Sequence, residues 1–320
     1  MNNQTSSSQS AIGMPLDLDS KNGTVLLFGE VLADIFPDRT VLGGAPFNVA
    51  RHLKAFGQSP VLITRLGSDA LRNEVLQAMS QYEMEIMGVQ CDGTHPTGQV
   101  QVHIEEGGHR FEILPMQAYD FINTAELQKT ILSVRPEMVY YGTLAQRNEI
   151  SRHALESLLL STDAAKFLDI NLRTPWYDEK TIRESLQYAN FVKLNDEELV
   201  ILAEMFELPG NSTDDQVVNL MNQFKVERAV ITCGEQGAWQ IDREGNKIAV
   251  GVKNKITKLV DTVGAGDGFA AVCILGSLKS WPAINTLERA IAFAGVICEI
   301  RGAIPDHADF YKPFTQEWDL

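Results

Sequence analysis

The sequence has few of the features that mark several large classes of protein. Its four cysteines are scattered over 320 residues, with no CxxC pair and no spacing typical of a zinc site. Basic charge is scarce: the formal net charge is −15 and the pI is near 4.8, which argues against a nucleic-acid-binding surface. No stretch approaches the ~18 consecutive apolar residues of a membrane span. We therefore expect a cytoplasmic protein with reduced cysteines and with neither nucleic acid nor a membrane as partner.

Two standard phosphate-binding motifs are missing as well. No GxxxxGK[ST] occurs anywhere in the chain, which excludes a P-loop. Gly264, Gly266 and Gly268 form GxGxG rather than GxGxxG and lie late in the chain, so a conventional dinucleotide-binding fold is disfavoured. A phosphate ligand is not excluded by the acidic composition, because a few amides and one or two arginines can bind one locally.

What the chain does contain is an alternation of short apolar runs with amphipathic stretches. The first 23 residues are rich in Ser, Asn and Gln and are expected to be a disordered leader rather than a signal peptide. Buried strands are predicted at residues 25–31, 60–67, 138–144, 166–172, 191–195 and 228–234. Helices are predicted, among other places, at residues 69–82, 150–160 and 197–206. Such alternation predicts an α/β fold with a mostly parallel sheet covered on both faces.

One segment, residues 98–114, departs from this rhythm. It alternates with period two, and its apolar positions Val100, Val102 and Ile104 lie between polar residues such as Gln99. The following EEGG predicts a turn, so the segment is interpreted as a β-hairpin with one polar face. A short extended piece at residues 34–41 could join it. The pattern leaves open whether the hairpin is peripheral or a lid over a site, and its edge could also pair two subunits into a homodimer.

The stretch DTVGAGDGF, residues 261–269, is the strongest candidate for a site. It follows the strand-like KITKLV, residues 255–260, and precedes an apolar helix pattern. Its glycines allow backbone N–H groups to converge at a helix start, which makes an anion-binding cradle. Asp267 within it has two interpretations. It could cap the helix, or it could act as a base that takes a proton from an attacking hydroxyl.

Polar residues at other expected helix starts and strand ends give further candidates. Gly43 and Gly44 precede a helix whose first turn carries Asn48, an amide that could cap the helix or bind a polyol. Asp34 follows the first strand, near the carboxyl end where ligands of open α/β sheets collect. After two later strands come the residues that could clamp a phosphate or hold Mg²⁺: Asn171, Arg173, Asn195, Asp196 and Glu198.

Together these stretches resemble the PfkB (ribokinase-like) family of carbohydrate kinases, and among them the bacterial fructokinase-type members. The family's amino-terminal signature is similar to GGAPFNVARHLKAFG, residues 43–57, and its carboxy-terminal signature to DTVGAGDGFAA, residues 261–271. NLR at residues 171–173, NxxE at residues 195–198 and ITCGEQGAW at residues 231–239 also match family elements.

The resemblance covers nearly the whole chain after the leader. It implies a ribokinase-like αβα sandwich, a Rossmann-like fold with a mostly parallel sheet, which carries a small β-sheet lid. We expect the kinase domain over residues 24–310, with lid elements around residues 34–42 and 98–114, followed by a C-terminal tail over residues 311–320.

The resemblance also implies roles for matching residues. Asp267 would be the base that deprotonates a sugar hydroxyl as it attacks the γ-phosphate of ATP, and Arg173 would clamp the transferred group. The amides of Gly264, Ala265 and Gly266 would stabilise the developing charge. The residues that would hold the sugar are Asp34, Gly43, Gly44, Asn48 and Gln99. The residues that would hold the nucleotide and its Mg²⁺ are Asn195, Glu198, Thr232, Gly234, Gly237 and the cradle glycines Gly264 and Gly266.

Members of the family often use a potassium-type cation beside the anion-binding loop. By resemblance, its ligands would be Asp261 and the carbonyl of Val263, with others from residues 301–303. Fructose is the expected sugar, while ribose, 2-keto-3-deoxygluconate, a nucleoside and a non-catalytic binding role remain alternatives. A sugar phosphate would need extra cations near the pocket, and the available arginines, Arg39, Arg51 and Arg110, are expected to face solvent.

Overall fold

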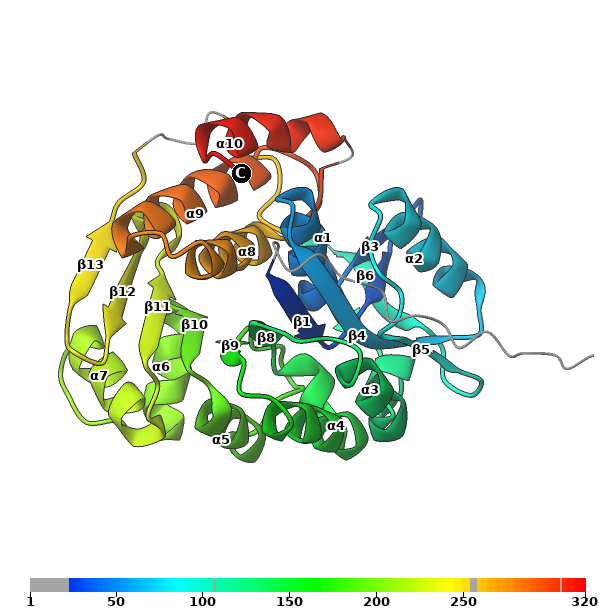
Figure 1. Ribbon diagram of the computed structural model, residues 1–320, viewed down its shortest axis with the longest axis horizontal. Helices are drawn as coiled ribbons and strands as arrows, with labels where there is room; N and C mark the ends of the chain where they lie inside the picture. Colours follow the sequence, from blue (N-terminus) through cyan, green and yellow to red (C-terminus); the bar gives the residue numbers. More distant parts are fainter. Residues whose placement is uncertain (1–22, 106–107, 254–257, 306) are drawn as a thin grey trace, which may run out of the picture.

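The computed structural model describes residues 23–105, 108–253, 258–305 and 307–320. Within them, a nine-stranded sheet forms the centre of the molecule (Figure 1). From one edge to the other its strands are β13 (Lys247–Val250), β12 (Ala238–Asp242), β11 (Arg228–Thr232), β10 (Phe191–Asn195), β9 (Ala165–Asp169), β8 (Met138–Tyr141), β1 (Thr24–Phe28), β4 (Ser59–Gly67) and β5 (Val89–Asp92). The strands from β11 to β5 run parallel, while β12 and β13 continue the sheet by antiparallel pairing.

Helices cover both faces of this sheet, as the sequence predicts. One face carries α3 (Thr124–Ile131), α4 (Glu149–Leu160), α5 (Glu179–Tyr188), α6 (Asp196–Met205) and α7 (Thr213–Phe224). The other face carries α1 (Ala45–Ala55), α2 (Ala70–Gln81), α8 (Ala265–Leu278) and α9 (Ala283–Ile297), with α10 (Lys312–Glu317) outside them. Short 3₁₀ turns lie at η1 (Ala118–Phe121), η2 (Leu144–Arg147), η3 (Gly234–Gln236) and η4 (Ala308–Tyr311). Two apolar cores result, one on each side of the sheet.

The six strands and three helices predicted from periodicity are all present, and most errors lie at their ends. The first strand, expected to reach Val31, ends at Phe28 because Gly29 has φ +145 and turns the chain. The strand expected over residues 166–172 ends at Asp169, shortly before Asn171, whose φ is +40. Both strands therefore end just before the polar residues that are candidates for the site. The strand expected at residues 255–260 lies partly outside the described residues, as does the leader.

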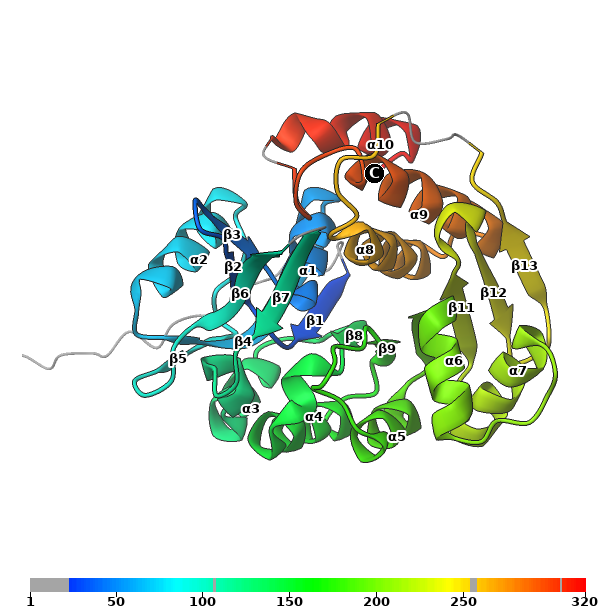
Figure 2. The ribbon, with the colours of Figure 1, turned by 180° about the vertical axis from the view of Figure 1, so that it is seen from behind.

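The hairpin and the short extended piece form one separate sheet, which confirms that the two segments join. Its strand order is β3 (Thr40–Gly43), β2 (Leu32–Ile35), β6 (Gly98–Glu105) and β7 (Gly108–Ile113). Figure 2 shows this sheet at one side of the large domain, beside α1. Val102 is buried as expected, but Ile104 on the same face is 69% exposed. This face of the sheet is therefore buried at Val102 and open to solvent near the turn. The middle of that turn lies outside the described residues.

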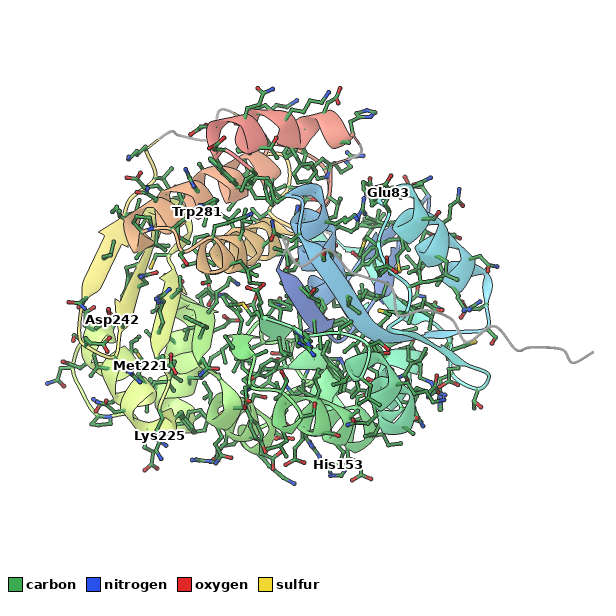
Figure 3. The ribbon with its side chains drawn as sticks, in the orientation of Figure 1. Glu83, His153, Met221, Lys225, Asp242 and Trp281 are labelled. Carbon is green, nitrogen blue, oxygen red and sulfur yellow. The ribbon has the colours of Figure 1, made fainter. Side chains whose placement is uncertain are left out.

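The residues beyond the expected domain boundary pack against the domain. Tyr311 and Trp318 are buried in the core that also contains α8 and α9. Trp281, labelled in Figure 3, lies in the connection between α8 and α9, where its ring meets that of Trp318 with centroids 5.7 Å apart. Tyr311 Oη lies 2.9 Å from Nδ1 of the buried His52 on α1. The last ten residues therefore pack against the helix layer that contains α1 and contact α1 through Tyr311.

All four cysteines have free thiols. In the described ranges, no helix combines the length and the apolar character needed to cross a membrane.

Candidate active site

The candidate residues gather at the carboxyl edge of the large sheet, where the parallel strands end together. Asn195 at the end of β10 is the register partner of Thr232 at the end of β11. The carboxyl ends of β1 and β9 open toward the same edge, because all four strands are parallel. Open α/β sheets bind ligands in the crevice outside the carboxyl ends of their strands.

The glycine stretch forms the start of α8. Gly264 is its N-cap residue, with φ +81, and a Cβ at this position would overlap Ala303. Only glycine therefore fits, because it adopts positive φ freely and allows the loop around Ala303 to approach. A glycine N-cap has no side chain to accept the first N–H groups of the helix. The Ala265 N–H, predicted to donate to the phosphate, donates to the Thr262 carbonyl at 3.3 Å, so the amides of Gly266 and Asp267 are the remaining candidates.

Asp267 lies in the first turn of α8 but does not cap it. Its Oδ2 accepts a hydrogen bond of 2.8 Å from Asn48 Nδ2, across 219 residues of sequence. Burial raises the pKa of this carboxyl above its usual range, opposed by the hydrogen bond from Asn48; Asp169 adds to the rise, and Lys193 and Arg173 oppose it. The capping interpretation is therefore wrong for Asp267, whose carboxylate is held toward a second helix instead.

That second helix, α1, also starts at a glycine. Gly44 has φ +108, and a Cβ there would come within 2.6 Å of the Glu30 carbonyl oxygen. Asn48 is 4% exposed, and its Oδ1 has no hydrogen-bond partner among the described residues. A buried carbonyl oxygen without a donor costs free energy, so this atom is suited to a ligand hydroxyl. Asn48 does not cap its own helix.

Two carboxylates and one arginine complete the centre of the site. Burial raises the pKa of Asp34 to about 6, with a further increase from Asp261 and a decrease from Arg173. Burial raises the pKa of Glu30 to about 7; Arg173 lowers it and Asp267 raises it. Arg173 is exposed and acts electrostatically on Asp34, Glu30 and Asp267 alike. The fold therefore brings together a lid residue, two strand ends and a helix start.

Gln99 is a correction to the predicted sugar-binding set. In the lid sheet, Gln99 pairs with Ala33 of β2, whereas Asp34 pairs with Val100. Since successive side chains of a strand point to opposite faces, Gln99 faces away from the surface that carries Asp34. We therefore withdraw Gln99 as a sugar-binding residue. Gly43 lies at the end of β3, next to Gly44, where an added Cβ would meet nothing closer than Leu32 at 3.9 Å.

Arg51 is a second correction. It was expected to face solvent, but it is buried, with its guanidinium carbon 3.9 Å from the ring centroid of Tyr82. Arg39 and Arg110 do lie at the surface, beside Asp38 and Glu112 respectively.

Asn195 and Glu198 form a capping box at the start of α6. Asn195 Oδ1 accepts the Glu198 N–H at 2.7 Å, and Glu198 Oε2 accepts the Asn195 N–H at 2.9 Å. Glu198 Oε1 also accepts the Leu172 N–H at 2.8 Å, which ties the loop after β9 to that after β10. Burial raises the pKa of Glu198, and Lys193 opposes this. Both residues thus order the loops here, and a carboxylate oxygen can still accept from a metal-bound water.

Thr232, Gly234 and Gly237 lie together in the turn from β11 to β12. Gly234 and Gly237 have φ of +52 and +98, and a Cβ on Gly237 would overlap the Val250 carbonyl. Gly237 is therefore required for packing against β13. A Cβ on Gly234 would meet open space, so only its φ of +52 favours glycine at that position.

Asp261 joins the two loops of the predicted cation site. Its Oδ1 accepts the Val263 N–H at 3.0 Å and its Oδ2 accepts the Gly302 N–H at 3.1 Å. The fold thus brings Asp261, Val263 and residues 301–303 together as the resemblance implies. Backbone carbonyls and one carboxylate are the hard oxygen donors that alkali and alkaline-earth cations accept.

Three charged residues near the site escaped the sequence interpretation: Glu30, Asp169 and Lys193. Each carries charge within or directly after a strand predicted to be buried, as in KFLDI and FVKLN. A charged residue in a strand predicted to be buried is a signal that sequence reasoning could have used, because a buried charge needs a partner. The pairing of Asp169 with Lys193 depends on β9 and β10 being neighbours, which the sequence does not state.

Comparisons with known proteins show the family and the fold of the chain. The model of the pfkB family of carbohydrate kinases matches residues 17–309. A probable fructokinase-5 from Arabidopsis thaliana is 26% identical over 310 residues, covering 88% of this chain and 93% of that protein. An ATP-bound fructokinase from Xylella fastidiosa superposes with a TM-score of 0.80 at 18% identity, over 93% of this chain and 99% of that one.

A second solved structure is a fructokinase double mutant from Vibrio cholerae O395 with fructose, ADP and potassium bound. It has a TM-score of 0.74 at 21% identity and covers 91% of this chain and 97% of that chain. The family match spans both glycine-started helices, the lid and the strand ends described above. The chain belongs to the pfkB family of carbohydrate kinases, phosphotransferases whose acceptor is a sugar hydroxyl.

Proposed function

We propose that the protein is an ATP-dependent sugar kinase whose acceptor is fructose. The observation that carries this proposal is the Asn48–Asp267 hydrogen bond between two helix starts that have glycine in place of a side-chain cap. It holds a carboxylate in the first turn of α8, as the deprotonation of a hydroxyl next to a phosphate requires. Several curated relatives are fructokinases, and two fructokinase structures with ATP or ADP share the fold.

In the proposed reaction, Asp267 accepts the proton of a sugar hydroxyl. The hydroxyl oxygen forms a bond to the γ-phosphorus of ATP, and the bond from that phosphorus to the β,γ-bridging oxygen breaks, so ADP leaves with the electron pair. The N–H groups at the start of α8 donate to the phosphoryl oxygens as charge develops. Removal of one such donor costs on the order of 3 kcal/mol in other enzymes. Arg173 adds a cation on the solvent side.

The sugar is held by acceptors rather than by cations. The unpaired Oδ1 of Asn48 accepts one hydroxyl hydrogen, and Asp34 accepts others when ionised. Glu30 and Asp261 add negative potential nearby. This favours a neutral sugar over a sugar acid or sugar phosphate, and Arg51 offers no compensation because it is buried against Tyr82. Ribose and nucleosides remain the alternatives that an assay must separate.

Mg²⁺ and a monovalent cation belong to the same proposal. Glu198 and Asn195 would order water around a nucleotide-bound Mg²⁺, which neutralises charge on the phosphates. Thr232, Gly234 and Gly237 would line the nucleotide. Potassium would bind Asp261 and carbonyls of Val263 and residues 301–303; the Vibrio cholerae structure contains that ion. A cation there would fix the loop that begins α8.

The protein is proposed to act in the cytoplasm as a homodimer through the lid. Ile104 and Phe111 are 69% and 48% exposed on the lid sheet, which makes an apolar surface for a second lid. Multi-angle light scattering at micromolar concentration should give twice the mass of one chain. A monomer under these conditions would contradict the dimer and leave the kinase assignment untouched.

The kinase assignment is tested by coupled ADP release with fructose, ribose, 2-keto-3-deoxygluconate, nucleosides and fructose phosphates. Fructose should give the highest kcat/KM, and no turnover with any of these acceptors would overturn the assignment. Asp34→Ala should raise the KM for fructose by about tenfold to a hundredfold, because one or two hydroxyl hydrogen bonds are lost. An unchanged KM would remove Asp34 from the sugar site.

A further inference from the structure

A buried ion pair lies directly behind the glycine cradle. Lys193 and Asp169 are register partners on β10 and β9, and Lys193 Nζ lies 2.8 and 3.0 Å from the two carboxylate oxygens. Their side chains are 8% and 0% exposed. Tyr140, on β8, donates from its hydroxyl to Asp169 Oδ2 at 3.2 Å. Three neighbouring strands thus hold one ammonium in a fixed position.

The ammonium end of this pair faces the start of α8. A Cβ built on Gly266 would lie 3.5 Å from Lys193 Nζ, closer than from any other atom outside the helix backbone. Burial by itself would lower the pKa of Lys193, but Asp169, Glu198 and Asp267 together hold it above its ordinary value. Lys193 is therefore a permanent cation behind the backbone of the cradle.

Stability does not explain this arrangement. A buried ion pair is often neutral or destabilising relative to apolar residues of similar volume, because desolvation of both charges offsets their attraction. The position is also unfavourable for a cation, since the start of a helix carries partial positive charge. An ammonium aimed at that end becomes favourable when an anion occupies the cradle.

We propose that Lys193 is a positioning residue for phosphoryl transfer: held by Asp169, which Tyr140 in turn holds, it is the positive end of a buried dipole that faces the cradle and stabilises the negative charge of the phosphoryl group passing there. The proposal rests on the function proposed above. Because the dipole is rigid, it requires no reorganisation during the reaction, which is the condition for effective electrostatic catalysis.

The two charges of the pair should act on Asp267 with opposite sign. The groups that face Asp267 come from several elements: Glu30 after β1, Asn48 on α1, Asp169 on β9, Arg173 after β9 and Lys193 on β10. Lys193 lowers the pKa of Asp267 and Asp169 raises it. Removing the lysine charge alone should move the acidic limb of kcat to higher pH, and removing the aspartate charge alone should move it to lower pH, by about one unit in each case.

The experiment compares Lys193→Met, Asp169→Asn and the double variant K193M/D169N by kcat, KM, pH profile and thermal unfolding. The double variant removes both charges of the pair, so neither Lys193 nor Asp169 is left buried without its partner; it should unfold near the wild-type temperature and keep the wild-type acidic limb. Its kcat should still fall by about tenfold or more, because the cation behind the cradle is gone. A double variant with kcat within about twofold of wild type would overturn the proposal.

A matched control is the ion pair of Arg65 and Asp92, which joins β4 and β5 at 2.9 Å, toward the other edge of the sheet. Arg65→Met should lower the unfolding temperature while kcat and the pH limb stay unchanged. If K193M/D169N does not fold, Lys193→Gln with Asp169→Asn provides a second neutral pair for the same measurement. Asp267→Asn separates the two proposals. Full turnover in that variant would refute Asp267 as the base. If Asp267→Asn loses turnover while the Lys193 variants keep the wild-type kcat, only the positioning role of Lys193 is refuted.

Discussion

The helices of this protein begin in two different ways. Six helices start at an N-cap residue whose side chain accepts a backbone N–H: Asp69 for α2, Asn123 for α3, Asn148 for α4, Asp178 for α5, Asn195 for α6 and Ser212 for α7. The helices α1 and α8 start at Gly44 and Gly264. The first group satisfies an amide with the side chain of its own N-cap residue, which a glycine cannot do. At the glycine starts, the Glu30 carboxylate accepts the Ala45 N–H and the Thr262 carbonyl accepts the Ala265 N–H.

The two kinds of helix start have different roles: a side-chain cap stabilises its helix, whereas the glycine starts lie at the candidate site. Replacing a side-chain cap by alanine costs about 1 kcal/mol, but replacing it by glycine costs only a few tenths. At Gly44 and Gly264 the close approach of Glu30 and Ala303 requires glycine. Both glycine starts lie at the carboxyl edge of the sheet, and their helices are linked by the Asn48–Asp267 hydrogen bond. Helices α9 and α10 also lack a side-chain cap, with Pro282 and Tyr311 as their N-cap residues. Helix α9 begins just after α8 ends, at the far end from the start of α8, and α10 lies outside both helices. A helix start without a side-chain cap therefore indicates a ligand site only where two such starts lie close together beside buried polar residues.

The largest expected effect comes from Asp267 in the first turn of α8. Asp267→Asn should lower kcat by about a thousandfold, because it removes a general base while keeping size and the hydrogen bond to Asn48. The unfolding temperature should stay the same or rise, since burial disfavours the charged carboxylate. ADP release and calorimetry of nucleotide binding measure both expectations. Loss of nucleotide binding in parallel with kcat would assign Asp267 a structural role instead.

Glu30 beside the start of α1 should have the next largest effect, on stability. Its carboxylate accepts the Ala45 N–H, and burial raises its pKa from 4.5 to about 7. A raised pKa means that the folded state binds the proton more tightly. The stabilising contribution is therefore full below about pH 4.5 and is lost as the pH rises through about 7.

Glu30→Gln removes this titration. The free energy of unfolding of the variant relative to wild type should increase by about 3 kcal/mol between about pH 4 and about pH 8. Denaturant unfolding at the two pH values measures the change. A difference that does not depend on pH would show that Glu30 titrates normally and that α1 begins without a strained carboxyl.

The smallest expected effect belongs to a capped helix. Ser212→Ala should cost about 1 kcal/mol of stability, because Ser212 Oγ no longer accepts the Asp215 N–H at the start of α7. Its kcat and KM should equal those of wild type. If this variant impaired turnover as Asp267→Asn does, the distinction between capped and glycine-started helices would fail.

Much of the fold followed from local pattern. Strand and helix periodicity depends on neighbouring residues, so the six strands were found, with errors where Gly29 and Asn171 turn the chain early. The GxGxG stretch was recognisable as a cradle because glycine's freedom at φ +81 is a property of one residue. The lid was partly predictable, since alternation identified β6 but gave no register. Gln99 was consequently expected to bind the sugar, although it lies on the face opposite Asp34.

The sequence by itself determined the α/β alternation, the hairpin, the glycine starts of two helices and the family resemblance, because these depend on residue type and short spacing. Only the tertiary structure decided that Asp267 meets Asn48, that Lys193 meets Asp169 behind Gly266, and that the last ten residues support α1. The physical reason is that each of these contacts joins elements brought together by sheet order and helix packing. Such contacts depend on burial across the whole chain, and no local pattern encodes them.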